Sequence, residues 1–178
     1  FEYSQSYFMF WDKLEKSNYF LENIIATLNE PRDGRLIMHL VENPIQDGGQ
    51  WHMFINLINK YGVVPQTEMP ETFQSSKSMR MNRMITRKLR EFAKLLRDAH
   101  GKGAHPKNLR SMKADMLETV YRLLTIHLGT PPEKFEWQVR DRKKKFHRFE
   151  GLTPKQFFTN HVGLDLSDYV CLIDCPMS

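Results

Sequence analysis

The sequence predicts a mainly α-helical protein with a small β component. Long stretches carry apolar residues at the 3.6-residue helical period, and one shorter stretch alternates apolar and polar residues with a period of two. Apolar residues make up 40% of the 178 residues and aromatic residues 12%, which is enough for a real core. The length predicts one domain, or one compact unit with an appended hairpin.

The first helix is predicted over residues 5–28, with Ser4 in position to cap its start. Its apolar positions form a stripe too broad for a single contact, so we expect this helix to be buried on more than one side. A short second helix is predicted over residues 34–42, capped by Asp33. The Asn43-Pro44 pair should close it, because the residue before a proline avoids the helical region.

A third helix is predicted to start at Gly48-Gly49 and to end at Gly62, where a glycine suits the left-handed position after a helix. Prolines and serines then recur through residues 65–78. They predict a loop without regular structure.

Two long helices, residues 77–99 and 106–128, are separated by the short turn His100-Gly101-Lys102-Gly103. Pro106 suits the first turn of the second helix. A short link and matching apolar stripes predict an antiparallel helical hairpin. The residues expected to face inward are Met81, Met84, Ile85, Leu89, Phe92, Leu95 and Leu96 in the first helix and Leu109, Met112, Met116, Leu117, Val120, Leu123, Leu124 and Leu128 in the second.

A β-hairpin is predicted after residue 131, where Phe135, Trp137 and Val139 alternate with polar residues. A basic turn, residues 141–145, leads to its second strand. Thr153-Pro154 then predicts a short helix. The final expected element is a short strand over residues 169–174, which would place Cys171 in a structural role and Cys175 in the turn after it.

The net charge of +5 raises the question of nucleic acid as a partner. The basic residues concentrate in residues 80–97 and in the hairpin turn, and we interpret both mainly as solvated faces. A weak alternative is nucleic-acid binding through the hairpin turn, because aromatic residues lie beside its basic residues. The basic residues concerned are Arg142, Lys143, Lys144 and Lys145.

Other functional classes find little support in the residue patterns. No apolar run approaches the roughly 18–20 residues that cross a bilayer, so no membrane association is expected. The histidines lack the spacing of metal ligands, and Cys171 and Cys175 lack a second ligand pair. We therefore expect no cofactor. On the first helix, Asp12 and Glu15 flank Lys13 and Lys16, and a solvated, ion-paired face explains these four charges.

The most informative motif is Asp47-Gly48-Gly49-Gln50-Trp51. Two adjacent glycines leave the backbone bare, so a ligand can lie against its N–H and C=O groups as a neighbouring strand would. From these residues alone, a ligand contact and a simple helix N-terminal turn are equally good interpretations. Trp51 on its own is more typical of a core residue, and His52 of a structural or solvent-facing one.

Several further motifs accompany this one in order along the chain. Together they resemble the bleomycin hydrolase and aminopeptidase C family of cytosolic, papain-like cysteine aminopeptidases, over nearly the whole chain. The motifs are Ser4-Gln5-Ser6-Tyr7-Phe8-Met9-Phe10-Trp11-Asp12-Lys13, Leu36-Ile37-Met38, Asn43-Pro44, Tyr61-Gly62-Val63-Val64-Pro65, Leu128-Gly129-Thr130-Pro131-Pro132-Glu133 and Leu152-Thr153-Pro154.

The resemblance implies a fold and a site. The chain would hold the helical half of a papain-like α+β catalytic domain (residues 1–74), a helical-hairpin insertion (75–130) and a β-hairpin with a short helix and a return strand (131–178). In papain-like enzymes a Gly-Gly pair at the rim of the cleft pairs with substrate backbone. The matching substrate-binding positions are Gly48 and Gly49, with Gln50 and Trp51 beginning the pocket wall.

The resemblance also implies what is missing. The family's nucleophile lies in a Gln…Cys-Trp motif, and no Cys-Trp occurs in this sequence. We expect an internal segment of the enzyme without the catalytic Cys, His and Asn, inactive by itself because a thiolate needs a base and oxyanion donors. Peptide substrates, a cytoplasmic location and assembly into homo-oligomers, hexamers in the family, are implied as well. The alternative is a non-catalytic helical module that binds peptide or nucleic acid.

Overall fold

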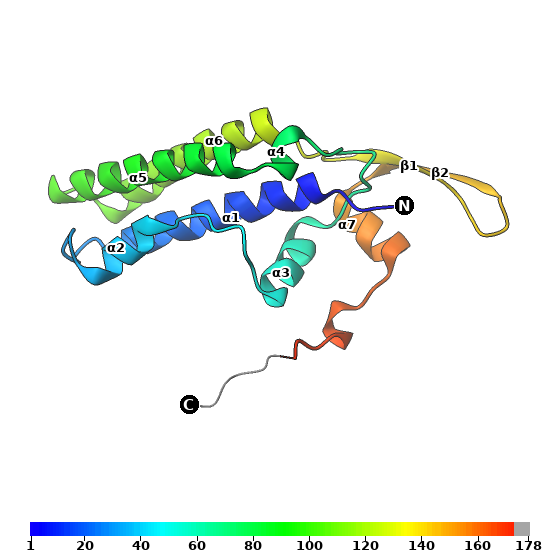
Figure 1. Ribbon diagram of the computed structural model, residues 1–178, viewed down its shortest axis with the longest axis horizontal. Coiled ribbons are helices and arrows are strands. Elements are labelled where there is room, and N and C mark those ends of the chain that lie inside the picture. The colour runs from blue at the N-terminus through cyan, green and yellow to red at the C-terminus, as the bar shows by residue number, and fades with distance from the viewer. Residues whose placement is uncertain (173–178) are drawn as a thin grey trace.

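A computed structural model describes residues 1–172 and shows a helical body from which a two-stranded hairpin projects (Figure 1). The prediction of a mainly helical protein with a small β component is confirmed. The elements are α1 (Gln5–Ala26), α2 (Arg35–Glu42), α3 (Trp51–Tyr61), α4 (Phe73–Ser76), α5 (Met79–Gly101), α6 (Pro106–Leu128), β1 (Phe135–Arg140), β2 (Phe146–Leu152), α7 (Pro154–Phe157), the π-helix η1 (Phe158–Val162) and the 3₁₀-helix η2 (Leu166–Asp168).

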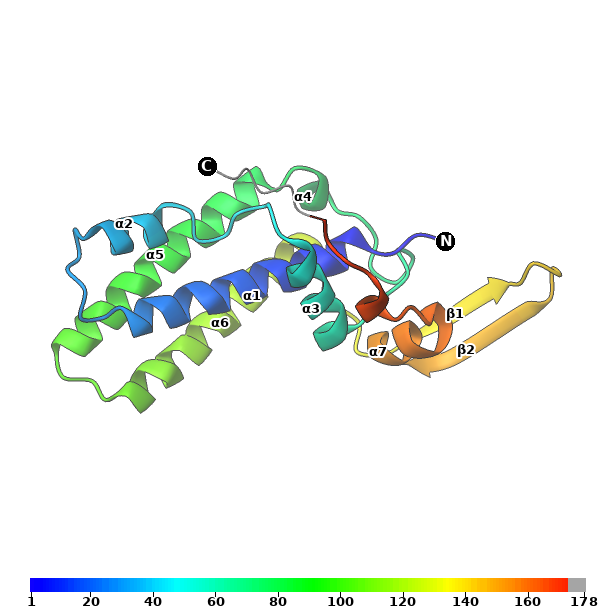
Figure 2. The same cartoon turned by 90° about the horizontal axis from the view of Figure 1, so that it is seen from below.

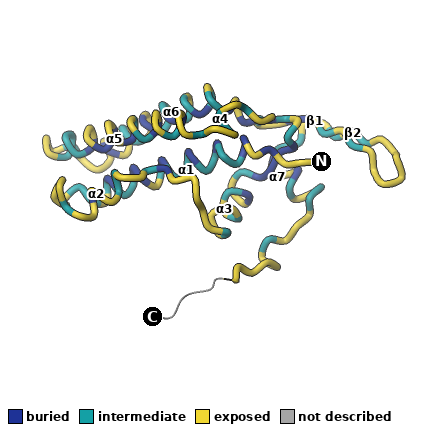
Figure 3. Tube along the Cα trace, in the orientation of Figure 1, coloured by how far each residue is buried: buried dark blue, intermediate teal, exposed yellow. Residues whose placement is uncertain are grey.

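The centre of the body is formed by α1, which packs against both α5 and α6 while these two helices pack against each other (Figure 2). The predicted helical hairpin of α5 and α6 is therefore confirmed. Contacts of α1 with α2, α3 and α4 also confirm its burial on more than one side. Buried residues follow the facing sides of α1, α5 and α6 (Figure 3). They include Phe10, Leu21 and Ile24 from α1, Ile85, Leu89 and Leu96 from α5, and Leu109, Val120 and Leu124 from α6.

The inward stripe of α5 is narrower than predicted. Met84 and Leu95 are exposed at 45% and 43%, so their assignment to the core is wrong. They lie on the flanks of a stripe whose centre already fills the space facing α1 and α6. One continuous hydrophobic cluster includes residues from all three predicted segments, 1–74, 75–130 and 131–178. The boundaries between these segments stay predictions.

Capping explains most of the helix starts. The Ser4 hydroxyl accepts the Tyr7 N–H at 3.0 Å, as predicted for α1. For α2 the prediction is wrong by one residue, because Gly34 is the N-cap and Asp33 supplies no cap bond. Part of the predicted loop of residues 65–78 is also helical: α4 forms there because Thr72 and Ser75 make a reciprocal capping box.

The predicted hairpin and the short helix after it are confirmed, whereas the π-helix η1 and the 3₁₀-helix η2 that follow were not predicted. β1 and β2 pair antiparallel, with Trp137 opposite Phe149 and a bulge before Trp137. Thr153 caps α7 as predicted. The expected strand over residues 169–174 is wrong for residues 169–172, which form none, and its last two residues lie outside the described residues.

Gly62 ends α3 and touches α7. Its N–H donates to the Ile58 carbonyl at 2.7 Å, and its φ of +78° has the positive sign predicted for this position. Its ψ of −159° lies outside the left-handed helical region. A Cβ at this position would stand 2.3 Å from the backbone carbon of Pro154, so α3 and α7 are in direct backbone contact here.

Within residues 1–172, the helices are too short or too polar to cross a lipid bilayer.

We predict that Gly62→Ala destabilises the protein by about 3 kcal/mol. The added methyl group meets the Pro154 backbone and forces an L-residue into a positive-φ conformation. Urea unfolding followed by circular dichroism measures the effect. Gly101→Ala is the matched control, because a Cβ there has open space around it, and this variant should lose no stability. Equal midpoints for the two variants would contradict the packing argument.

Candidate functional site

The predicted site residues lie in and beside the glycine segment, residues 46–50, which connects the end of the α2 region to α3. Gly48, Gly49 and Gln50 are exposed, whereas Trp51 is half-buried. The prediction that α3 starts at the double glycine is wrong. Gln50 is the N-cap and the helix starts at Trp51, so both glycines precede the helix and are not part of its first turn.

Nothing within the described chain requires glycine at these two positions. Gly48 and Gly49 are not among the glycines with positive φ. A Cβ on Gly48 would meet no atom within 4 Å, and one on Gly49 would meet only the Met53 sulfur at 3.9 Å. This differs from Gly62, where conformation and packing both exclude a side chain. A close approach at Gly48 and Gly49 would have to come from another molecule.

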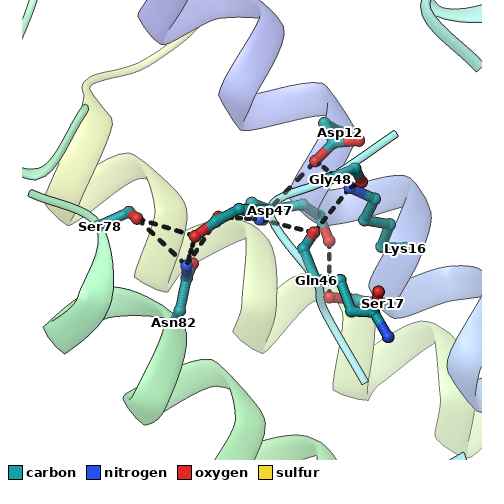
Figure 4. A network of polar contacts seen from close by, with 9 residues as sticks. Asp12, Lys16, Ser17, Gln46, Asp47, Gly48, Ser78 and Asn82 are labelled. Carbon is teal, nitrogen blue, oxygen red and sulfur yellow. Dashed lines mark hydrogen bonds and ion pairs between the residues drawn. The ribbon is translucent and has the colours of Figure 1, made fainter. Parts of the chain in front are cut away.

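The carbonyl groups of the glycine segment are held by two lysines of α1. Lys16 Nζ donates to the carbonyl oxygens of Gln46 and Gly48 at 2.7 and 2.8 Å, and to Asp12 Oδ2 at 2.8 Å (Figure 4). Lys13 Nζ also donates to the Gln46 carbonyl, at 3.1 Å. The backbone of the segment is therefore fixed on the side that faces α1.

Asp47 joins the glycine segment to α1 and α5 at once. Its Oδ1 accepts from Lys13 Nζ at 2.6 Å and from Asn82 Nδ2 at 2.8 Å, and its Oδ2 accepts from Ser78 Oγ at 3.3 Å (Figure 4). Partial burial by itself raises the pKa of Asp47, but the hydrogen bonds from Lys13 and Asn82 outweigh it, so the pKa lies below its ordinary value of 3.8. Asp47 is therefore a carboxylate at neutral pH.

Gly49 keeps its main-chain groups open. In the described part of the chain its N–H and C=O make no hydrogen bond, and neither does the N–H of Gly48. The next carbonyl, that of Gln50, is already occupied by the N–H of Met53 at 3.0 Å. A free donor and a free acceptor on one exposed residue are what an extended peptide needs to pair with a backbone edge.

Two open grooves meet at the glycine segment. One has a volume of about 520 Å³ and an apolar wall between α1 and α3, formed by Phe8, Met9, Trp51, Phe54 and Leu57. The other has a volume of about 880 Å³, and the residues along it include Tyr19, Asn43, Asn56 and Lys60. Gly49, Gln50 and Met53 border both grooves, so the predicted binding residues do lie at the rim of a depression.

Trp51, the first residue of α3, lines the apolar groove. Its ring centroid lies 5.9 Å from that of Phe54 and 6.3 Å from that of Tyr169. Gln50 is exposed and has no side-chain capping bond to α3. The structure therefore brings all four predicted residues to one edge, and their contact with substrate stays a prediction.

The sequence did not predict the charged residues that hold this edge in place. Lys13 is only 1% exposed, so its assignment to a solvated face is wrong. The available sequence signal was its spacing, three residues after Phe10 and seven before Phe20, because both aromatic residues belong to the widened apolar stripe of α1 that the structure buries. A lysine on such a stripe indicates a distant carboxylate, but the sequence does not say which one.

Other sequence candidates lie elsewhere. His52 is exposed, in agreement with a solvent-facing role. Cys171 is exposed rather than part of a strand, which corrects its structural assignment, and Cys175 lies outside the described residues. Among residues 1–172, no group of three or more His, Cys, Asp or Glu side chains is arranged to hold a metal ion.

The fold and the sequence assign the chain to a class of peptidases. The model of the Peptidase C1-like family matches residues 1–178, and the chain belongs to that family. The solved structure of PepW from Lactobacillus rhamnosis superposes with a TM-score of 0.90 at 46% identity, covering 94% of this chain and 38% of the PepW chain. The helical fold described above is therefore that of part of a papain-like peptidase.

Curated relatives are similar over nearly the whole chain. Aminopeptidase C of Listeria innocua is 48% identical over 176 residues, which cover 99% of this chain and 39% of the relative. Bleomycin hydrolase of Gallus gallus is 42% identical over 180 residues, covering 99% of this chain and 40% of the relative. The chain thus spans about two-fifths of the length of these relatives, and the resemblance found in the sequence motifs is confirmed.

We predict that Asp47 contributes stability that acid removes. Because its native pKa is lowered, this contribution is fully present above the ordinary pKa of 3.8 and is lost as the pH falls through the lower native value. The difference in Tm between wild type and Asp47→Asn should be largest at neutral pH and should shrink below pH 3.8.

Thermal scans between neutral and acidic pH measure this difference. Asp115→Asn on α6 is the control, because the exposed Asp115 side chain makes no hydrogen bond or ion pair among residues 1–172. The difference in Tm between wild type and Asp115→Asn should not shrink in the same way as the pH falls below 3.8. A difference for Asp47→Asn that stays constant over the whole range would contradict the ion-pair account.

Proposed function

We propose that the chain supplies one wall of the substrate cleft of a cysteine aminopeptidase similar to aminopeptidase C and bleomycin hydrolase. The observation that carries the proposal is Gly49. Gly49 is exposed at the junction of two grooves, and within residues 1–172 its N–H and C=O have no partner and no neighbouring atom requires a glycine there. The names of the relatives support the reaction class.

An extended peptide would pair with Gly49 as an added antiparallel strand. Main-chain hydrogen bonds supply affinity without reading the substrate sequence, and pockets for alternate side chains supply preference. The lining of the apolar groove, with Trp51, Phe54 and Leu57, suits an apolar substrate side chain. Any side chain on Gly49 itself would occupy the space in which the peptide lies.

Bond cleavage in this class is thiolate attack on the N-terminal peptide bond, formation of an acyl-enzyme and its hydrolysis. The thiolate requires an imidazole within hydrogen-bond distance and donors for the oxyanion. Cys171 makes no hydrogen bond to a histidine among residues 1–172 and is exposed. The proposed role of the substrate-binding residues, Gly48 to Trp51, is therefore to hold substrate. We expect the isolated chain to bind peptide without hydrolysing it.

We predict that Gly49→Val weakens peptide binding about tenfold or more while leaving the fold intact. The valine side chain projects into the space of the substrate, yet a Cβ there meets only the Met53 sulfur at 3.9 Å. Titration of the ¹⁵N-labelled chain with the tripeptide amide Ala-Phe-Ala-NH₂ should shift the amide signals of residues 48 and 49 in wild type, and should shift those of the variant only at about tenfold or more higher peptide concentration. Two lost main-chain hydrogen bonds correspond to about tenfold or more in Kd.

Gly101→Val is the matched control, since Gly101 also has open space at its Cβ but lies far along α5 from the grooves. It should bind as wild type does. Normal binding by Gly49→Val would sink the proposal. The same samples, given an aminoacyl fluorogenic substrate and a thiol reductant, should show no turnover, and turnover that is sensitive to E-64 would contradict a purely substrate-holding role.

The partner and location proposals rest on the family resemblance. A cytoplasmic location and assembly into a homo-oligomer are properties that the resemblance implies.

A second candidate function is nucleic-acid binding through the basic hairpin. The observation in its favour is that the turn between β1 and β2 projects from the body (Figure 3). Within the described residues none of its four basic side chains forms an ion pair. These are Arg142, Lys143, Lys144 and Lys145. Such a tip binds phosphate groups without regard to sequence, and its affinity falls steeply with salt.

We predict that the hairpin binds single-stranded DNA only at low salt. Fluorescence anisotropy with a labelled oligonucleotide should show weak binding at about 0.02 M salt, none at about 0.15 M, and loss of the weak binding in the variant with Lys143, Lys144 and Lys145 changed to alanine. Changing Lys88, Lys94 and Lys102 to alanine provides a charge-matched control. Binding that persists at physiological salt and depends on the hairpin would favour the nucleic-acid module.

A further inference from the structure

The buried ammonium group of Lys13 lies beneath the glycine segment. Lys13 belongs to the buried stripe of α1 and is 1% exposed. An ammonium group is costly to remove from water unless charges and hydrogen bonds compensate it. The compensation comes almost entirely from the glycine segment: Asp47 Oδ1 at 2.6 Å and the Gln46 carbonyl at 3.1 Å, with Asp12 Oδ2 more distant at 3.8 Å.

The glycine segment has few other attachments. Among residues 1–172, the hydrogen bonds that tie residues 46–48 to the rest of the chain all run to Lys13 and Lys16 of α1 or to Ser78 and Asn82 of α5. Ile45, just before the segment, is buried. The position of the backbone between Ile45 and the start of α3 therefore depends on these four side chains.

We propose that Lys13 is a positioning residue, which through its ion pair with Asp47 fixes the glycine segment so that Gly49 presents its N–H and C=O to a peptide. This inference rests on the proposed function of Gly49. Lys13 and Lys16 hold the Gln46 carbonyl against α1, and Lys16 also holds the Gly48 carbonyl. The N–H and C=O of Gly49, the next residue, have no partner among residues 1–172 and stay available to a peptide.

Stability alone is a poor explanation for this ion pair. Replacing a buried charge by an apolar side chain of similar volume, together with its partner, is often neutral for stability, because desolvation consumes the Coulomb energy. The ion pair instead fixes the position of the glycine-segment backbone relative to α1. Asp47 is also bound by Asn82 and Ser78 at the start of α5, so the same carboxylate connects the helical hairpin of α5 and α6 to the peptide-binding edge.

The experiment measures backbone order and peptide binding separately in the ¹⁵N-labelled chain. The {¹H}-¹⁵N heteronuclear NOE of the Gly48 and Gly49 amides reports order in the free protein. In Lys13→Met, which keeps the length of the side chain without its charge, this NOE should fall well below that of the α1 amides, and the Kd for Ala-Phe-Ala-NH₂ should rise about tenfold or more. Lys88→Met, which removes an exposed ion pair with Glu91, should change neither quantity.

The double variant Lys13→Met/Asp47→Ala is the second variant, because it removes both partners and so leaves no uncompensated charge in the core if Lys13→Met alone fails to fold. It should reproduce both effects. An unchanged NOE at Gly48 and Gly49 in the folded variants would overturn the positioning role. If the NOE falls as expected while the wild type shows no peptide-induced shift at these glycines, the positioning role stands and the proposed function fails.

Discussion

The interaction on which the site depends is the contact between the buried Lys13 ammonium and the glycine segment. It lies on the same face of α1 that packs against α5 and α6, so the core of the three helices and the exposed edge share one element. The core fixes α1, α1 fixes Lys13 and Lys16, and these fix the carbonyls of Gln46 and Gly48. A flexible, glycine-containing connection thereby acquires a defined direction without secondary structure of its own.

The chain uses glycine for two opposite physical reasons. At Gly62 the constraint is internal, because positive φ and a direct contact with the Pro154 backbone leave no room for a methyl group. At Gly48 and Gly49 the described chain leaves the space empty, and the absence of a side chain has meaning only with respect to a second molecule. The two cases look alike in a sequence and differ completely in three dimensions.

Most of the fold followed from the sequence because it depends on local signals. The caps at Ser4 and Thr153 and the alternation around Trp137 each act over a few residues, and they were confirmed. The predictions failed where a local pattern was ambiguous or where contacts were long-range. The strand expected over residues 169–174 needed a partner, and the described chain gives none to its residues 169–172. Lys13 was assigned to solvent because its partner, Asp47, is 34 residues away. The four predicted binding residues were placed by a motif, but the charges that support them required coordinates.

The central claim is that an extended peptide pairs with Gly49 in an antiparallel arrangement. Intermolecular NOEs between the Gly48–Gly49 backbone protons and a bound, ¹³C-labelled peptide test it most directly. The account predicts a close contact between the α-protons of Gly48, the neighbour of the hydrogen-bonded Gly49, and those of the facing peptide residue, as in a non-hydrogen-bonded antiparallel pair, where the Cα atoms are about 4.5 Å apart. Peptide contacts confined to another surface, such as the β-hairpin, with none to Gly48 or Gly49, would contradict it.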